Sequence, residues 1–490
     1  MARMSGNDPF RCVEEVIYQL DAARTQAGIK PAALYRSIEE LEAKAQPSIE
    51  ALTLEYASEG ARLQRAHERR IWNAVAEFWR HLGAAYEDCF WQFQSGEGGS
   101  EGLKEAIPVI VSRAIRALGA ELKWTKMAYG PADPTLWGRM GALYVIAEQT
   151  NRSREPCLIS THSDEESSIH DEYLRVLMFS MAAVDTLTPQ RIELVHRLSA
   201  SFVHAFLMQT QPGKGCHYYV DLSAARPPAR LVDRLLSPAP NPRYYGPGQA
   251  GAQTEKLIDL IESRNEVPVD LGLGNAYEPA AVAGALRHLA RQWASIPPAR
   301  GEEREESSAR LRIVHDFDTV LKAVLALGRN PQIEASMETW TVQNTSVHGL
   351  GAVLPETPQD WLRVGTLIAT RPEGGASWGV GVIRRITMNP NRQRYVGIQM
   401  MSQSTTPVRL FAADASEETE NQGEVALLLP SNGEDSAGRS ELDLLLRPGS
   451  FFAHRPVLME FHQRTYPLMP KQVVEAGRDF EMVRFRVEQR

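Results

Sequence analysis

Cysteine is scarce and scattered in this 490-residue sequence. The four cysteines, Cys12, Cys89, Cys157 and Cys216, lie far apart, and no two have the spacing of a zinc or redox motif. Isolated thiols are typical of a reducing compartment, where structural disulfides are rare. We therefore expect free thiols, no metal site and a cytoplasmic protein.

Long apolar runs are also missing. No stretch approaches the ~18 uncharged apolar residues of a membrane-spanning helix, and the opening MARMSGNDPFRCVEEV has no apolar signal-peptide core. The net charge of −8 gives no support to a protein that binds nucleic acid or membrane surfaces through general electrostatic attraction. We expect neither nucleic acid nor a membrane as partner.

Lysine is also scarce, with nine lysines against 44 arginines. The planar fork of arginine matches phosphate and guanine edges, which lysine cannot do. A codon bias of the source genome explains the excess more simply, so composition alone identifies no ligand. The hydrophobic and charged fractions, 43% and 23%, are those of an ordinary globular protein, and the length predicts three or four domains.

The first half of the chain has helical patterns. In residues 71–90 the apolar positions recur at spacings of three and four, as on one face of a helix. Another helix is predicted after Thr188, which can cap it, with Pro189 in its first turn. A short strand is expected at 217–223, within a stretch richer in proline and glycine.

After residue 298 the pattern changes to period two with many β-branched residues, which is typical of strands. Segment 316–327 between the first two strands has a pattern compatible with a helix. Short strands at this spacing predict a small closed barrel. The strands expected in it are 311–315, 339–343, 366–370, 378–386, 395–400 and 408–411.

These patterns predict an α+β multidomain protein with a helical first half. We expect a helical domain at 1–150, a second helical or mixed domain at 151–296, a six-stranded β-barrel at 297–412 and a smaller β module at 413–490.

One motif inside the expected barrel suggests a function. Residues 344–349, NTSVHG, directly follow the strand ETWTVQ, and the strands LIAT, WGVGVIRRI and RYVGIQM come after them. Asn, Ser and Gly are turn residues, so a plain turn explains the six-residue pattern alone. With the strands that follow, however, residues 300–410 resemble the PilZ family of cyclic di-GMP receptors, which has a (D/N)-x-S-x-x-G signature. The resemblance implies ligand binding rather than catalysis.

The same resemblance implies the site residues. Asn344 and Ser346 would reach polar atoms of guanine, and Gly349 would let the backbone turn close to the ligand. The family also carries an R-x-x-x-R motif before the barrel, which Arg300 and Arg304 match literally. In the family these arginines clamp guanine and phosphate, and the chemistry suits arginine.

This sequence departs from the family pattern in two ways. Four glutamates crowd segment 302–306 and oppose an anionic ligand, and the distance to the N-x-S-x-x-G motif is long. Arg310 or Arg312 is therefore an alternative clamp, and a solvated charged linker is the plain structural alternative. Arg384 and Arg385 are neighbours in a strand, so we expect them on opposite faces, with Arg385 assigned to the ligand face.

A rival constellation lies near His162, Asp164, His170 and Asp171, which is similar to the metal-binding set of HD-type phosphohydrolases. The two histidines are too close for that arrangement, and a polar loop that caps the helix beginning near residue 172 explains the residues more simply. No other catalytic motif is present, so we expect no catalytic residue and no cofactor.

Three hypotheses remain at this point. The first is a cyclic di-GMP receptor that couples its barrel to a helical region binding an unidentified protein partner. The second is a degenerate barrel that binds only proteins, and the third is a metal-dependent phosphohydrolase in the helical half. Helices with broad apolar faces make a homo-oligomer plausible in each case.

Overall fold

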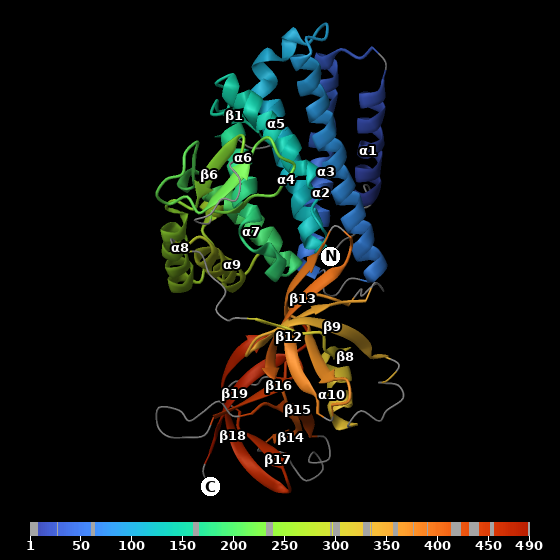
Figure 1. Cartoon of the computed structure of the whole chain (residues 1–490), viewed down its shortest axis with the longest axis vertical. Coiled ribbons are helices and arrows are strands. Elements are labelled where there is room, and N and C mark those ends of the chain that lie inside the picture. The colour runs from blue at the N-terminus through green and yellow to red at the C-terminus, as the bar shows by residue number, and fades with distance from the viewer. Residues whose placement is uncertain are drawn as a thin grey trace. The chain divides into compact units, whose positions relative to one another are not determined.

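The computed structural model describes residues 8–26, 28–59, 64–159, 166–231, 239–294, 296, 304–326, 334, 336–355, 361–375, 377–389, 391–412, 423–430, 441–450 and 455–488 (Figure 1). The chain divides into two compact units, Met1–Ala299 and Arg300–Arg490. Within the described ranges, no helix has the length and apolar character needed to cross a membrane. All four cysteines are free thiols.

The first unit is mainly helical. Its long helices are α1 (Pro9–Thr25), α2 (Pro31–Glu59), α3 (Arg65–Gln94), α4 (Ile107–Met127), α5 (Thr135–Gln149), α6 (Ile169–Ser180), α7 (Pro189–Ser201), α8 (Ala250–Arg264) and α9 (Pro279–Gln292). Helix α4 is buried along almost its whole length and packs against α3, α5, α6 and α7. The predicted helix at 71–90 lies inside α3, and α7 begins at Pro189 as expected, with Thr188 at its N-cap.

A small antiparallel sheet completes this unit. Its strands β3 (Leu207–Gln209), β6 (Pro242–Gly246), β4 (Tyr218–Asp221) and β5 (Ala229–Arg230) lie in the order β3-β6-β4-β5, and β4 lies within the predicted strand 217–223. A separate pair, β1 (Cys157–Leu158) and β2 (Glu166–Ser167), precedes α6. One hydrophobic core runs from Phe10 to Trp293 and includes residues on both sides of the boundary that we expected at residue 150.

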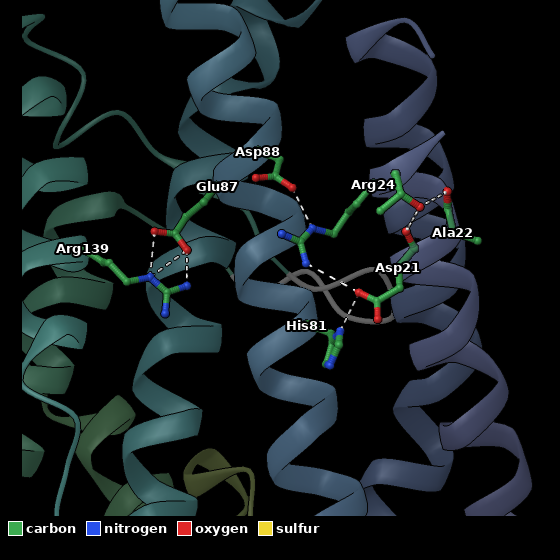
Figure 2. Close-up of polar contacts among 8 residues, drawn as sticks. Asp21, Ala22, Arg24, His81, Glu87, Asp88 and Arg139 are labelled. Carbon is green, nitrogen blue, oxygen red and sulfur yellow. Dashed lines mark hydrogen bonds and ion pairs between the residues drawn. The ribbon is translucent and has the colours of Figure 1, made fainter. Parts of the chain in front are cut away.

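Polar contacts also fix the helices of this unit against each other (Figure 2). The Arg24 Nε of α1 donates to Asp88 of α3 at 2.6 Å, and His81 of α3 lies 2.8 Å from Asp21 of α1. On the other side of α3, Glu87 accepts two hydrogen bonds of 3.1 Å from Arg139 of α5. Such pairs specify which helix faces meet.

The second unit contains two six-stranded barrels. The first is formed by β8 (Arg310–His315), β9 (Glu338–Thr345), β10 (Gly349–Val353), β11 (Leu367–Pro372), β12 (Gly379–Met388) and β13 (Arg394–Ser402). The strand order is β10-β13-β12-β11-β8-β9, and pairing of β9 with β10 closes the barrel. The short β7 (Glu305–Glu306) runs outside this circle, beside β9. Helix α10 (Phe317–Leu325) occupies the segment that we expected to be helical.

The second closed barrel consists of β14 (Thr406–Ala412), β15 (Glu424–Leu428), β16 (Glu441–Leu446), β17 (Val457–Phe461), β18 (Arg464–Ala476) and β19 (Glu481–Val487). Our placement of strand 408–411 in the first barrel is wrong, because β14 pairs with β15 and β17 and its Val408 and Leu410 enter the second core. The sixth strand of the first barrel is instead β10, which we did not predict. Its sequence, GLGAV, has two glycines where strand formers are expected.

Candidate ligand site on the first barrel

The predicted N-x-S-x-x-G motif forms the hairpin between β9 and β10. The Ser346 backbone N–H donates to the Gly349 carbonyl at 2.8 Å, which closes the turn, and Val347 at its tip is 76% exposed. Gly349 does not have a positive φ, so a left-handed backbone is not what requires glycine there. The requirement is space, because a Cβ at Gly349 would lie 3.0 Å from the Ser346 Oγ.

The structure brings Arg304 to this motif. Pairing of β7 with β9 places Glu306 opposite Asn344, so the segment before the barrel runs along the motif as an edge strand. The Arg304 Nη1 donates to the Asn344 Oδ1 at 2.6 Å, although 40 positions separate the two residues. Arg300 lies outside the described residues.

Asn344 faces outward because of a β-bulge. Val342, two positions earlier, is buried, so regular alternation would point Asn344 into the core as well. The register instead pairs Ala352 with Val342 and Gly351 with Asn344, which leaves Gln343 as an extra residue on β9. An extra residue resets the alternation and turns the following side chain to the other face.

A second bulge turns Arg385 outward. Ile383 pairs with Ile398 and Arg385 pairs with Gly397, so Arg384 is the extra residue on β12. Ile383 is buried, whereas Arg385 is exposed. The expected assignment of Arg384 and Arg385 to opposite faces of a regular strand is therefore wrong. Arg384 leaves the core too, and its guanidinium binds Glu475 of β18 at 2.5 and 2.6 Å.

Two glycines separate these outward residues. Across the sheet the register runs from Arg385 to Gly397, then Gly351, then Asn344. A Cβ at Gly351 would lie 2.5 Å from the Asn344 Oδ1, and one at Gly397 would lie 3.2 Å from the Arg385 Cβ. Gly351 and Gly397, which we call the glycine strip, thus leave bare, partly exposed backbone between an amide and a guanidinium.

Bare backbone bordered by such groups suits a flat polar ring. A ring can approach the strip closely because no Cβ stands in the way, while arginine and asparagine offer hydrogen bonds to its edges. The predicted site residues do not include the two glycines. Gly397 gave one signal, a glycine in the interior of an expected strand, which indicates close approach of another group. Gly351 gave none, because it lies in β10, which we did not predict.

The remaining predicted arginines lie away from the strip. Arg310 and Arg312 alternate with buried Leu311 and Ile313 on β8, and their cross-strand partners are Thr341 and Thr339. They occupy the outer face beyond the Gln343 bulge. The exposed Glu305 and Glu306 are closer, because they pair with Thr345 and Asn344, so negative charge does border the site as the sequence indicated.

The rival metal constellation is only partly described, since His162 and Asp164 lie outside the described residues. His170 is buried and its Nδ1 lies 2.8 Å from the Tyr144 hydroxyl. Ser168 caps α6 by accepting from the Asp171 N–H at 3.1 Å, which confirms the capping interpretation of this loop. Among the described residues, no group of three or more His, Cys, Asp or Glu side chains could hold a metal ion.

Comparison with known proteins adds one finding. Residues 1–212 match the family model described as the N-terminal domain of the cyclic-di-GMP receptor FimW. The search of curated proteins finds no match. The match confirms the predicted resemblance to cyclic di-GMP receptors, and it does so in the helical half, far in sequence from the motif on which the prediction rested.

Proposed function

We propose that this chain, whose first 212 residues match the N-terminal domain of the cyclic-di-GMP receptor FimW, is itself a receptor for cyclic di-GMP. The ligand would bind on the first barrel, over the glycine strip. The observation that carries the proposal is the pair of bulges that turn Asn344 and Arg385 outward on either side of Gly351 and Gly397. The activity would be binding rather than catalysis.

The geometry suggests how the dinucleotide is held. One guanine would lie on the strip, with Arg385 and Asn344 at its edges, because arginine and asparagine donate to purine acceptors. Arg304 would exchange its hydrogen bond with Asn344 for a charge-assisted bond to a phosphate, which is the stronger of the two. Ser346 and Gly349 would maintain the hairpin beside the ligand.

Ligand binding would also act on the segment that precedes the barrel. Arg304 directly precedes β7, a strand of two residues. Within the described part of the chain, β7 pairs with β9 alone. A ligand that holds Arg304 would stabilise this strand, which follows the helical half in the sequence. We propose that the helical half, in the cytoplasm, responds by presenting a surface to a protein partner.

One observation favours a second function. Glu305 and Glu306 border Asn344, and their charges oppose a bis-phosphate ligand. A barrel that has lost the ligand and serves only as a scaffold for proteins would carry such residues without cost.

Isothermal titration of the full chain with cyclic di-GMP, with GTP and cyclic di-AMP as controls, tests the proposal. We expect selective, saturable binding. Arg304→Ala and Arg385→Ala should each weaken it by about 1.5–3 kcal/mol, as charged hydrogen bonds are lost. Arg409→Ala, which removes an exposed arginine from β14 of the second barrel, is the matched control. Parent-like affinity in the Arg304/Arg385 double variant would refute this site, and the absence of any heat would favour the scaffold.

A further inference from the structure

A polar pocket in the helical unit has no role in the function proposed above. It has a volume of about 350 Å³ and lies where the end of α5, the turn after it, the start of α6 and the strands β3 and β6 meet. The residues that line it are Tyr144, Glu148, Asn151, Ser153, Arg154, His170, Met208, Gln209, Thr210 and Arg243. Nine of these ten side chains carry polar atoms.

His170 leaves a hydrogen-bonding atom unused in this pocket. The side chain is only 5% exposed, its Nδ1 bonds to the Tyr144 hydroxyl and its backbone N–H donates to Ser153. The Nε2 has no partner among the residues that the structure describes. Because His170 lines the pocket, a ligand there can form a hydrogen bond with this ring nitrogen.

Arg154 is the second group with unused capacity. Its exposed guanidinium forms no hydrogen bond or ion pair within the described part of the chain, although it lines the pocket beside His170. The chain turns just after α5, where Asn151 adopts a left-handed φ of 57°.

The charges of the pocket do not cancel. Arg243 and Glu148 neutralise each other through a two-pronged ion pair, and the remaining Arg243 nitrogen donates to Asn241 and Pro242. Burial, aided by the nearby Arg154, lowers the pKa of His170 to about 4, so this ring is neutral near pH 7. Among the described residues that line the pocket, Arg154 therefore leaves a net positive charge of one unit.

We propose that this pocket binds a small metabolite through a phosphate or carboxylate group, with Arg154 as the anionic group's anchor and His170 and Ser153 as further contacts. A guanidinium binds either anion through two parallel N–H groups. The volume is at the low end for small-molecule pockets, which favours a compact ligand over a whole cyclic dinucleotide. The helical half would then sense a second signal in addition to the one received by the barrel.

Titration calorimetry of the full chain with inorganic phosphate, pyrophosphate and citrate, at constant ionic strength in a phosphate-free buffer, tests this site. We expect saturable binding of at least one of the three. Preference for phosphate and pyrophosphate indicates a phosphorylated ligand, and preference for citrate a carboxylate. Arg154→Gln should weaken binding at least tenfold without unfolding the protein, since the side chain is exposed.

Two controls make the result specific. Arg191→Gln removes an exposed arginine from α7 of the same unit, outside the pocket, and should leave anion binding unchanged. Arg154→Gln should leave cyclic di-GMP binding unchanged, which separates this site from the one on the barrel. The proposal is overturned if none of the three anions binds, or if Arg154→Gln binds them as the parent protein does.

Discussion

At the scale of single residues, the candidate site depends on side chains that are absent as much as on those present. Gly351 and Gly397 leave the backbone bare between Asn344 and Arg385, and each glycine is in contact range of one of these neighbours. A methyl group on the strip would occupy the place of the proposed ring. Binding should therefore be more sensitive to these positions than folding is.

Gly351→Ala tests this separation. The new Cβ would meet the end of the flexible Asn344 side chain at 2.5 Å, which can move aside, so we expect a loss of stability below about 1 kcal/mol. Cyclic di-GMP affinity should fall at least tenfold, because Asn344 is displaced and the strip is blocked. Thermal melting and calorimetry on the same sample measure both effects, and unchanged affinity would contradict the use of the strip.

Asp479 should make stability depend on pH. Its Oδ1 accepts the Leu367 N–H at 3.0 Å, whereas the buried Oδ2 has no partner among the described residues. Burial raises the pKa of Asp479 from 3.8 to about 6. Between these two pH values the folded protein therefore keeps a proton on Asp479 that the unfolded chain has released. This contribution is complete below about pH 4 and is lost as the pH rises to about 6; it amounts to at most ~3 kcal/mol.

Urea unfolding of Asp479→Asn and of the parent protein at pH 4.5 and pH 7 measures this contribution. The variant should lose less stability than the parent between the two values. An equal loss in both proteins would show that Asp479 is not the group responsible.

At the scale of elements, two bulges and one edge strand build the site. The bulges at Gln343 and Arg384 act on β9 and β12, which flank the strands that carry the glycines. The edge strand β7 brings Arg304 to Asn344 and, with it, two glutamates. The same element thus supplies one attractive charge and two repulsive ones.

Neutralising the glutamates of β7 should strengthen ligand binding. Glu305→Gln with Glu306→Gln removes two negative charges beside the site, and we expect cyclic di-GMP to bind about 2- to 5-fold more tightly, consistent with ~0.5–1 kcal/mol for exposed charge interactions. The gain should shrink in high salt, which screens exposed charges. Glu460→Gln in the second barrel is the control. An equal gain in affinity in this control and in the double variant would indicate a nonspecific effect of net charge.

At the scale of the whole molecule, the two barrels of the second unit share a core. Phe317 and Val320 of α10 belong to the same hydrophobic cluster as Leu427, Leu445 and Phe480 of the second barrel. The Arg384–Glu475 and Arg447–Asp318 ion pairs also join them. The barrels should therefore unfold together rather than separately.

Phe480→Ala tests this cooperativity. The side chain is fully buried in the shared core, so its truncation should cost ~3–5 kcal/mol. Hydrogen exchange should show faster exchange by the same factor in β11 of the first barrel and β16 of the second. Loss of protection confined to the second barrel would mean that the two fold independently.

The sequence by itself determined the local structure. Apolar spacings of three and four placed the helices of the first half, and period-two patterns placed five of the six strands of the first barrel. Turn residues at 344–349 marked the hairpin. These features follow from side-chain periodicity and turn chemistry, which act over a few residues and can be recognised without knowing the fold.

Only the tertiary structure decided which strands pair and on which side of the sheet each side chain lies. It assigned β14 to the second barrel, made a strand of the glycine-rich β10, and turned Asn344 and Arg385 outward through two bulges. It also gathered the pocket around His170 from four separate segments. Register and strand pairing depend on the packing of residues far apart in the chain, and one extra residue in a strand reverses the face of every residue after it.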